Sequence, residues 1–290
     1  MATADSFLKP SLSNQAGGQI DVIAYPAAVK GVLTRILQAG HGKPIIFLHG
    51  VGARADRWRR NFNIAIEGYR CFALDLPGHG LAQKGPDFPY GVRGYADFVE
   101  GFLDDQKIDK VTLVGTSLGA HIAATVACRA PRRLSSLVLV GATGMFPLTP
   151  EIASGIADRL KDLTREGIER KLKNVVFDPN MLTDSWIQEE YAINNSPGAR
   201  ETFERLSEYF RHHINSDVVG DQLSKIVDQV PTTLIWGEQD RSVPLAVGQR
   251  TKELLNGVPL HVMAACAHVP YLEAPELFRR HLSEALKRIH

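Results

Sequence analysis

Short apolar segments recur along the chain, and most of them are bounded by glycine or proline. Continuous apolar runs of this length are typical of strands buried on both faces of a parallel sheet. The predicted strands span residues 32–37, 44–48, 70–74, 111–114, 137–140, 232–236 and 260–263, and the clearest predicted helices span 95–106, 118–129 and 275–289. Because strands alternate with helices, we predict an α/β fold with a doubly wound, mostly parallel sheet, in which strands 32–37 and 44–48 are neighbours.

The segment 145–225 departs from this alternation. It contains no good strand pattern, but its apolar residues recur at helical spacing, for example at Ile152 and Ile156, and prolines separate the patterns. A helical segment of this length between two strands of an α/β core is typical of a cap or lid. We therefore divide the chain into a core of residues 1–144 and 226–290 and an inserted helical cap of residues 145–225.

Charge and composition narrow the possible functions. The 290 residues include 33 Lys and Arg against 32 Asp and Glu, a formal net charge of +1, which argues against nucleic acid or an acidic membrane as the main partner. The sequence has no run of 18 or more apolar residues, so no membrane span is predicted. The first ten residues lack the basic and apolar regions of a signal peptide, so a cytoplasmic location is expected. Cys71, Cys128 and Cys266 are too few and too scattered for a disulfide framework or a metal site. We expect no metal and no organic cofactor.

The candidate nucleophile is Ser117, which lies in a G-x-S-x-G pattern between Gly115 and Gly119. The pattern alone is weak, because glycine and serine are common. Its context is more specific, since it follows the predicted strand 111–114 directly and opens the predicted helix 118–129, as a nucleophile elbow does. The two glycines remove side chains that would collide in such a sharp turn. The helix start also directs free N–H groups toward charge that develops beside Ser117.

A serine hydroxyl needs a base, because unassisted it is a poor nucleophile at neutral pH. His268 follows the last predicted strand, on a loop that can present it at the carboxyl edge of the sheet. Asp240 lies four residues beyond the predicted strand 232–236, where it can accept the imidazole N–H and fix the tautomer. Glu238 is the local rival and is interpreted as a solvated loop charge. The sequence therefore predicts a Ser117, Asp240 and His268 triad in that chain order.

The residues after the predicted strand 44–48 are candidates for the oxyanion hole. Acyl transfer needs two fixed donors where the carbonyl oxygen becomes negative. The backbone N–H groups of Val51 and Leu118 are the natural pair. We interpret His49 as a brace that holds this loop by hydrogen bonding, with Gly50 as a further supporting residue.

Taken together, these motifs resemble those of the α/β-hydrolase superfamily. The resemblance is carried by five ordered motifs, which lie at 49–50, 75–80, 115–119, 237–240 and 268–276. It implies the α/β-hydrolase fold with a helical cap, and a serine hydrolase activity that uses the triad named above. It also implies that the motif at 75–80 is a structural turn, so that its aspartate and histidine have no chemical role.

The predicted cap and its segment 175–184 also resemble the meta-cleavage-product hydrolases, which cut a C–C bond in vinylogous diketo acids. The sequence differs from that group at several positions. Thr116 stands where the group usually has asparagine, and Val269 stands where an aromatic residue follows the histidine. Acidic residues at 189–190 stand where a cap arginine would bind the substrate carboxylate. The basic residues that we consider as substitutes for that arginine are Arg59, Arg60 and Arg165.

The function predicted from sequence is hydrolysis of a small, partly apolar ester, lactone, amide or activated C–C bond. Ser117 would attack the carbonyl carbon while His268 takes the serine proton. Two alternatives keep the same motifs. One is a small-molecule receptor on this fold with slow or no turnover, and the other is a cofactor-free perhydrolase or acyltransferase. The sequence is compatible with an oligomer.

Overall fold

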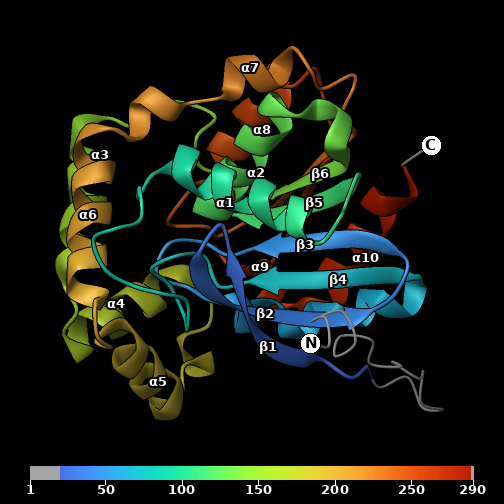
Figure 1. The fold of residues 1–290 in the computed structure, drawn as a ribbon. Helices are drawn as coiled ribbons and strands as arrows, with labels where there is room; N and C mark the ends of the chain where they lie inside the picture. The colour runs from blue at the N-terminus through green and yellow to red at the C-terminus, as the bar shows by residue number, and fades with distance from the viewer. Residues whose placement is uncertain (1–19, 289–290) are drawn as a thin grey trace, which may run out of the picture.

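The computed structural model describes residues 20–288, in which eight strands form a single sheet (Figure 1). The strand order is β1-β2-β4-β3-β5-β6-β7-β8. Neighbours from β4 to β8 pair in parallel, whereas β1 with β2 and β2 with β4 are antiparallel. This confirms the predicted mostly parallel α/β sheet. The strands are β1 Ile23–Val29, β2 Val32–Gly40, β3 Lys43–Leu48, β4 Tyr69–Leu74, β5 Val111–Thr116, β6 Leu134–Val140, β7 Thr232–Gly237 and β8 Leu260–Met263.

Helices cover both faces of the sheet, and each face has its own apolar core. One core contains α1 (Val92–Asp105) and α2 (Leu118–Arg129), with α8 (Leu245–Leu254) packed against it. The other contains the 3₁₀ segment η2 (Ala55–Glu67), α9 (Pro270–Glu273) and α10 (Pro275–Lys287). A short 3₁₀ turn, η3 (Pro131–Arg133), precedes β6. Helix α2 has the predicted bounds, and α1 and α10 lie within a few residues of theirs; residue 289 of the predicted last helix lies outside the described residues.

The order of the first strands corrects one prediction. We expected the strands at 32–37 and 44–48 to be neighbours, but β4 lies between β2 and β3. The connection from β2 to β3 crosses the start of β4, where Lys43 N donates to Gly68 O at 3.2 Å. Gly42 permits this close crossing. Its φ is +100°, and a Cβ at this position would lie 2.2 Å from the Gly68 carbonyl oxygen. The apolar pattern of the strands carries no information about this crossing.

The chain between β6 and β7 forms helices only. They are α3 Pro150–Lys161, α4 Arg165–Val175, η4 Pro179–Met181, α5 Asp184–Asn194, α6 Ala199–His212, η5 Ile214–Asp217 and α7 Gly220–Ser224. Figure 1 shows α3, α4, α5 and α6 beyond the end of the sheet toward which the β3 and β4 arrows point. Across residues 20–288, every helix is too short or too polar to cross a membrane.

Candidate active site

Loops that carry the candidate residues meet at the carboxyl ends of the parallel strands. Residues 49–52 follow β3, Ser117 follows β5, Asp240 follows β7 and His268 follows β8. The strands β3, β5, β6, β7 and β8 are consecutive parallel neighbours, so these loops leave the same edge of the sheet. Ser117 N donates a hydrogen bond of 3.0 Å to Val140 O, which holds the serine backbone against the end of the neighbouring strand β6.

Ser117 occupies a strained backbone position between strand and helix. Its φ of +53° and ψ of −119° lie in a region that residues with a side chain rarely adopt. Helix α2 begins at the next residue, and close packing of the turn requires the flanking glycines. A Cβ at Gly115 would lie 2.2 Å from Gly119 O, and a Cβ at Gly119 would lie 2.3 Å from Leu48 O. This is the backbone geometry that a nucleophile elbow needs.

Asp240 and His268 form a buried hydrogen-bonded pair. Asp240 Oδ2 lies 2.7 Å from His268 Nδ1, and the two residues are only 6% and 7% exposed. The other carboxylate oxygen, Oδ1, accepts the backbone N–H groups of Ser242 at 2.8 Å and Val243 at 2.9 Å. These bonds hold the carboxylate so that it accepts the Nδ1 proton, which leaves Nε2 as the basic nitrogen of the imidazole.

Gly141 packs directly against this pair, and the sequence reasoning did not single it out. A Cβ on Gly141 would lie 3.1 Å from both Asp240 Oδ2 and His268 Nδ1. Its φ is +48°, and its N–H donates to Ile235 O of β7 at 3.1 Å, so its backbone is held in place. The available sequence signal was a glycine immediately after a buried strand, which is a common feature of α/β folds.

His49 braces the loop that follows β3. Its Nε2 accepts the backbone N–H of Leu76 at 3.0 Å, so Nδ1 carries the proton and donates to Gly50 O at 2.8 Å. Complete burial, together with the nearby charges of Arg35 and Arg54, lowers the pKa of His49 to about 4. The ring is therefore neutral at pH 7, and it joins the loop to the segment that follows β4, because Nδ1 bonds Gly50 and Nε2 bonds Leu76.

The two candidate oxyanion donors lie on either side of the elbow. Gly50 lies beside Ser117, since a Cβ on Gly50 would be 3.2 Å from Ser117 Cβ and 3.8 Å from Oγ. Within the described part of the chain, the N–H of Val51, the residue after Gly50, has no backbone acceptor. The N–H of Leu118, the first residue of α2, has no intrahelical partner by its position in the helix. Two unpaired N–H groups beside a nucleophile can stabilise an oxyanion.

Comparison with known proteins identifies the family of the chain. A family profile described as "alpha/beta hydrolase fold" matches residues 43–275. The chain belongs to this family. It is 31% identical over 258 residues to a 2-hydroxy-6-oxononadienedioate/2-hydroxy-6-oxononatrienedioate hydrolase of Burkholderia vietnamiensis, a match that covers 84% of the chain and 87% of that protein. It is 28% identical to an uncharacterized hydrolase of Bacillus subtilis, over 84% of the chain and 89% of that protein.

Solved structures place this α/β-hydrolase among the same relatives. The meta-cleavage product hydrolase of Pseudomonas fluorescens IP01 superimposes with a TM-score of 0.83 at 27% identity, covering 92% of the chain and 99% of that structure. A serine hydrolase involved in carbazole degradation superimposes with a TM-score of 0.79 at 26% identity, covering 92% and 99%. The chain is therefore a hydrolase-family enzyme whose relatives include C–C bond hydrolases.

In this α/β-hydrolase the histidine loop is tied to the inserted helices. His268 N donates to Val175 O at the end of α4, at 3.0 Å. The Glu273 carboxylate accepts the backbone N–H of Ala267 at 2.8 Å and also that of Phe177, in the segment after α4. The inserted helices therefore contribute directly to the position of the loop that carries the imidazole.

The basic residues proposed as substitutes for a cap arginine do not gather at the site. Arg59 and Arg60 are exposed. Arg165 forms an ion pair with Asp184, whose side chain is 85% exposed, so this pair lies at the surface. Within residues 20–288, no hydrogen bond or ion pair joins any of the three to the candidate triad.

The acidic residues of α5 instead meet two arginines that the sequence reasoning missed. Glu190 is buried and pairs with Arg54 at 3.2 Å and with Arg57. Arg54 and Glu190 are 136 residues apart in the chain, and no local pattern links them. The only available signal was an arginine close behind the predicted oxyanion loop.

One group of possible metal ligands occurs within residues 20–288. It consists of His261 on β8 with His281 and Glu284 on α10, whose ligand atoms lie within 4.8 Å of one another. It includes no residue of the candidate triad or of the candidate oxyanion loop.

Proposed function

We propose that this α/β-hydrolase is a serine hydrolase with Ser117 as nucleophile, His268 as base and Asp240 as the acid that orients the base. The observation that carries the proposal is the hydrogen bond of 2.7 Å between Asp240 and His268. The loops that carry these two residues lie at the same edge of the sheet as the strained Ser117. The free N–H groups of Val51 and Leu118 support it, because they supply the donors that acyl transfer requires.

The proposed reaction proceeds in two stages. His268 Nε2 takes the Ser117 hydroxyl proton as Oγ attacks the carbonyl carbon, while Asp240 stabilises the imidazolium. The carbonyl oxygen becomes negative and accepts hydrogen bonds from Val51 and Leu118. His268 then returns the proton to the leaving group, and the acyl group stays on Ser117. In the second stage the imidazole activates water, which releases the acid and restores the serine.

We further propose that residues 145–225 act as a cap over this site and select the substrate. The bonds from His268 N to Val175 O and from Phe177 N to Glu273 support this role, since they join the inserted helices to the histidine loop. The position of α3, α4, α5 and α6 beyond the carboxyl end of the sheet also supports it (Figure 1). The substrate would be a small, partly apolar carbonyl compound enclosed between cap and core.

Two substrate classes follow from different observations. Arg54 and Arg57 are already paired with an acidic residue of α5, and Arg165 lies at the surface. These arginines are therefore not free to bind a substrate carboxylate, which favours an uncharged ester or lactone. The named relatives favour a second candidate, hydrolysis of a C–C bond in a 2-hydroxy-6-oxo dienoic acid. In that reaction the bond that breaks is the one between the attacked carbonyl carbon and the dienoate carbon, and the leaving carbon takes the proton.

Kinetics on both substrate classes test the proposal. The purified protein is assayed with a panel of p-nitrophenyl esters and with 2-hydroxy-6-oxo dienoic acids, beside the Ser117→Ala variant. We expect multiple turnovers on at least one class and a loss of about 10⁴-fold or more in kcat with Ser117→Ala. The class with the higher kcat/KM identifies the substrate. Stoichiometric labelling of Ser117 without turnover would instead favour the receptor alternative, and turnover that survives the substitution would refute the proposed nucleophile.

A further inference from the structure

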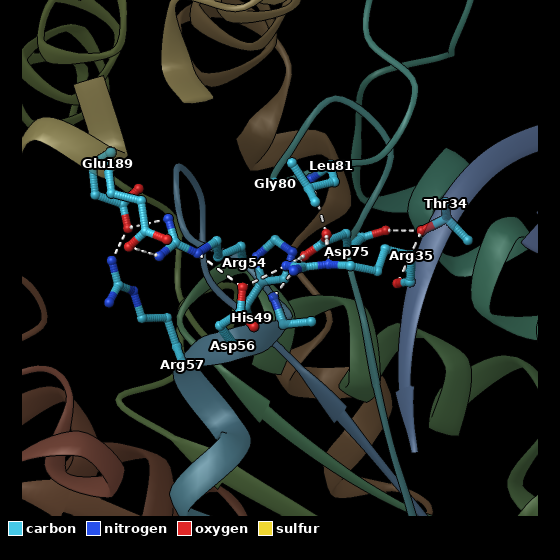
Figure 2. A network of polar contacts seen from close by, with 12 residues as sticks. Thr34, Arg35, His49, Arg54, Asp56, Arg57, Asp75, Gly80, Leu81 and Glu189 are labelled. Carbon is cyan, nitrogen blue, oxygen red and sulfur yellow. Dashed lines mark hydrogen bonds and ion pairs between the residues drawn. The ribbon is translucent and has the colours of Figure 1, made fainter. Parts of the chain in front are cut away.

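A chain of ion pairs runs from the central sheet toward the inserted helices (Figure 2). Arg35 of β2 binds Asp75 with Nε at 2.8 Å and Asp56 with Nη2 at 2.6 Å. Asp56 also accepts a hydrogen bond from Arg54 Nε at 3.1 Å. Asp75 is fully buried and accepts the backbone N–H of Ala55 at 2.8 Å. Core residues thus bind Arg54 in two places: Asp75 bonds the backbone of the next residue, and Asp56 bonds one edge of the guanidinium.

The other edge of the same guanidinium contacts helix α5. Arg54 Nη1 donates to Glu190 Oε1 at 3.2 Å, and Nη2 donates to Glu189 (Figure 2). Arg57 also pairs with Glu190, and its guanidinium lies 4.2 Å from the centroid of the Trp186 ring. Burial, together with repulsion by Arg54, lowers the pKa of Arg57 to about 9, so it is still charged at neutral pH. Two cations of the core therefore bind two acids of α5.

Because this cluster is buried, the loss of any of its ion pairs would be energetically costly. Arg54 and Glu190 are each only 3% exposed. A buried charge that loses its partner is costly, because neither water nor another ion replaces the lost interaction. All three nitrogens of the Arg54 guanidinium face carboxylates, which the planar arginine fork can satisfy and a lysine ammonium cannot. The position of Arg54 is therefore set jointly by the core and by α5.

Arg54 is also only three residues from a proposed oxyanion donor. Ala53 N donates to Gly50 O at 3.2 Å, which closes a turn around Val51. On the other side, Arg57 N donates to Arg54 O at 3.1 Å as η2 begins. The peptide between Val51 and Arg54 is thus short and bounded by hydrogen bonds, so a shift of Arg54 moves the Val51 N–H. Oxyanion donors act only when they lie about 3 Å from the developing charge.

We propose that Arg54 and Glu190 are positioning residues, whose ion pair makes the placement of the Val51 N–H depend on the docking of helix α5. The proposal rests on the proposed function, since it assigns Val51 to the oxyanion hole. Its consequence is that the site reaches full transition-state stabilisation only when α5 is seated on the core. Binding of a substrate beneath the inserted helices and alignment of the oxyanion loop are then coupled through one buried cluster.

The test uses Glu190→Gln, which keeps the shape of the side chain and removes its charge. Asp184→Asn is the matched control, because Asp184 belongs to the same helix and its side chain is 85% exposed in a surface pair. Hydrogen–deuterium exchange of the peptide spanning residues 49–57 and steady-state kinetics on the best ester or dienoic acid are measured for both. We expect exchange in Glu190→Gln to be faster by about tenfold or more, while Asp184→Asn matches the wild type.

The kinetic expectation separates positioning from binding. A donor that acts in the transition state affects kcat, so Glu190→Gln should lower kcat by about tenfold or more with KM little changed. A wild-type kcat in Glu190→Gln, or an equal loss in Asp184→Asn, overturns the proposal. If Glu190→Gln does not fold, Glu189→Gln replaces it, because Glu189 is more than half exposed; about threefold lower kcat is then expected, and an unchanged kcat overturns the proposal.

Failure of the proposed function is distinguishable from failure of this inference. If the wild type shows no turnover that depends on Ser117, the hydrolase proposal fails. The exchange measurement on residues 49–57 still tests the link between α5 and the loop, because it needs no substrate. Unchanged exchange in Glu190→Gln overturns the link even where the enzyme is active.

Discussion

Gly141 offers the sharpest test of the proposed triad, because alanine at this position adds one methyl group directly against the catalytic pair. The new Cβ would lie 3.1 Å from Asp240 Oδ2, 3.1 Å from His268 Nδ1 and 3.2 Å from His268 Cε1. Ordinary contacts between such atoms are about 3.5–4.0 Å, so the atoms must separate by several tenths of an ångström. The hydrogen bond from Gly141 N to Ile235 O resists a compensating backbone shift.

The expected result is a large loss of activity with a modest loss of stability. Displacement of the Asp240–His268 pair should lower kcat/KM by about 100-fold, as small misplacements of catalytic groups do. The positive φ of +48° adds backbone strain of about 1–2 kcal/mol for a residue with a Cβ. In a chain of this length that strain lowers Tm by roughly 2–4 °C for each kcal/mol.

Gly257→Ala is the matched control for Gly141→Ala. Gly257 has a φ of +79°, but no atom lies within 4 Å of the Cβ position. It should therefore show a similar fall in Tm by calorimetry and a wild-type kcat/KM in the ester or dienoate assay. Wild-type activity in Gly141→Ala, or an equal loss of activity in Gly257→Ala, would refute the reasoning that the methyl group acts on the triad.

Two further predictions concern the aspartate that bonds His268 and the buried His49. Asp240→Asn should leave the fold intact and lower kcat by about 10⁴-fold, because the amide no longer fixes the productive imidazole tautomer; steady-state kinetics that show less than a tenfold loss would contradict the role of Asp240. His49 has its pKa lowered to about 4 by burial, so the folded state resists its protonation. The free energy of unfolding should accordingly decrease as the pH falls from about 6.5 toward 4, by up to about 3 kcal/mol from this residue. Urea unfolding at pH 7 and pH 4.5 measures the decrease, which should be smaller in His49→Gln than in the wild type; an equal decrease in both would exclude His49 as its source.

The sequence predicted the buried parts of the sheet well, because continuous apolar runs mark strands that are covered on both faces. Strand β1 (Ile23–Val29) escaped notice although its burial alternates along the chain, since an alternating strand at the sheet edge has few strongly apolar residues. The position of β4 between β2 and β3 also could not be predicted, because it depends on a crossing at Gly42 rather than on the pattern of either strand.

The candidate site likewise contains some residues that could be predicted from the sequence and others that could not. Ser117, Asp240 and His268 were recognisable because each follows a predicted strand within a short motif, and the structure places Asp240 2.7 Å from His268. Gly141 and the Arg54–Glu190 pair had no such signal. Gly141 matters through the atoms that its missing side chain would meet, and Arg54 and Glu190 are 136 positions apart in the chain, so only the folded structure brings them together.

The order of these residues along the chain also determines when, during synthesis, the proposed triad can first be complete. Ser117 lies between β5 and α2, whereas the proposed base follows β8, the last of the described strands along the chain. A chain synthesised only as far as α2 contains the serine but lacks both His268 and Val140, whose carbonyl oxygen accepts the Ser117 N–H. The proposed triad is therefore complete only after residue 268 has been synthesised, so a product truncated before β8 would lack the base that activates Ser117.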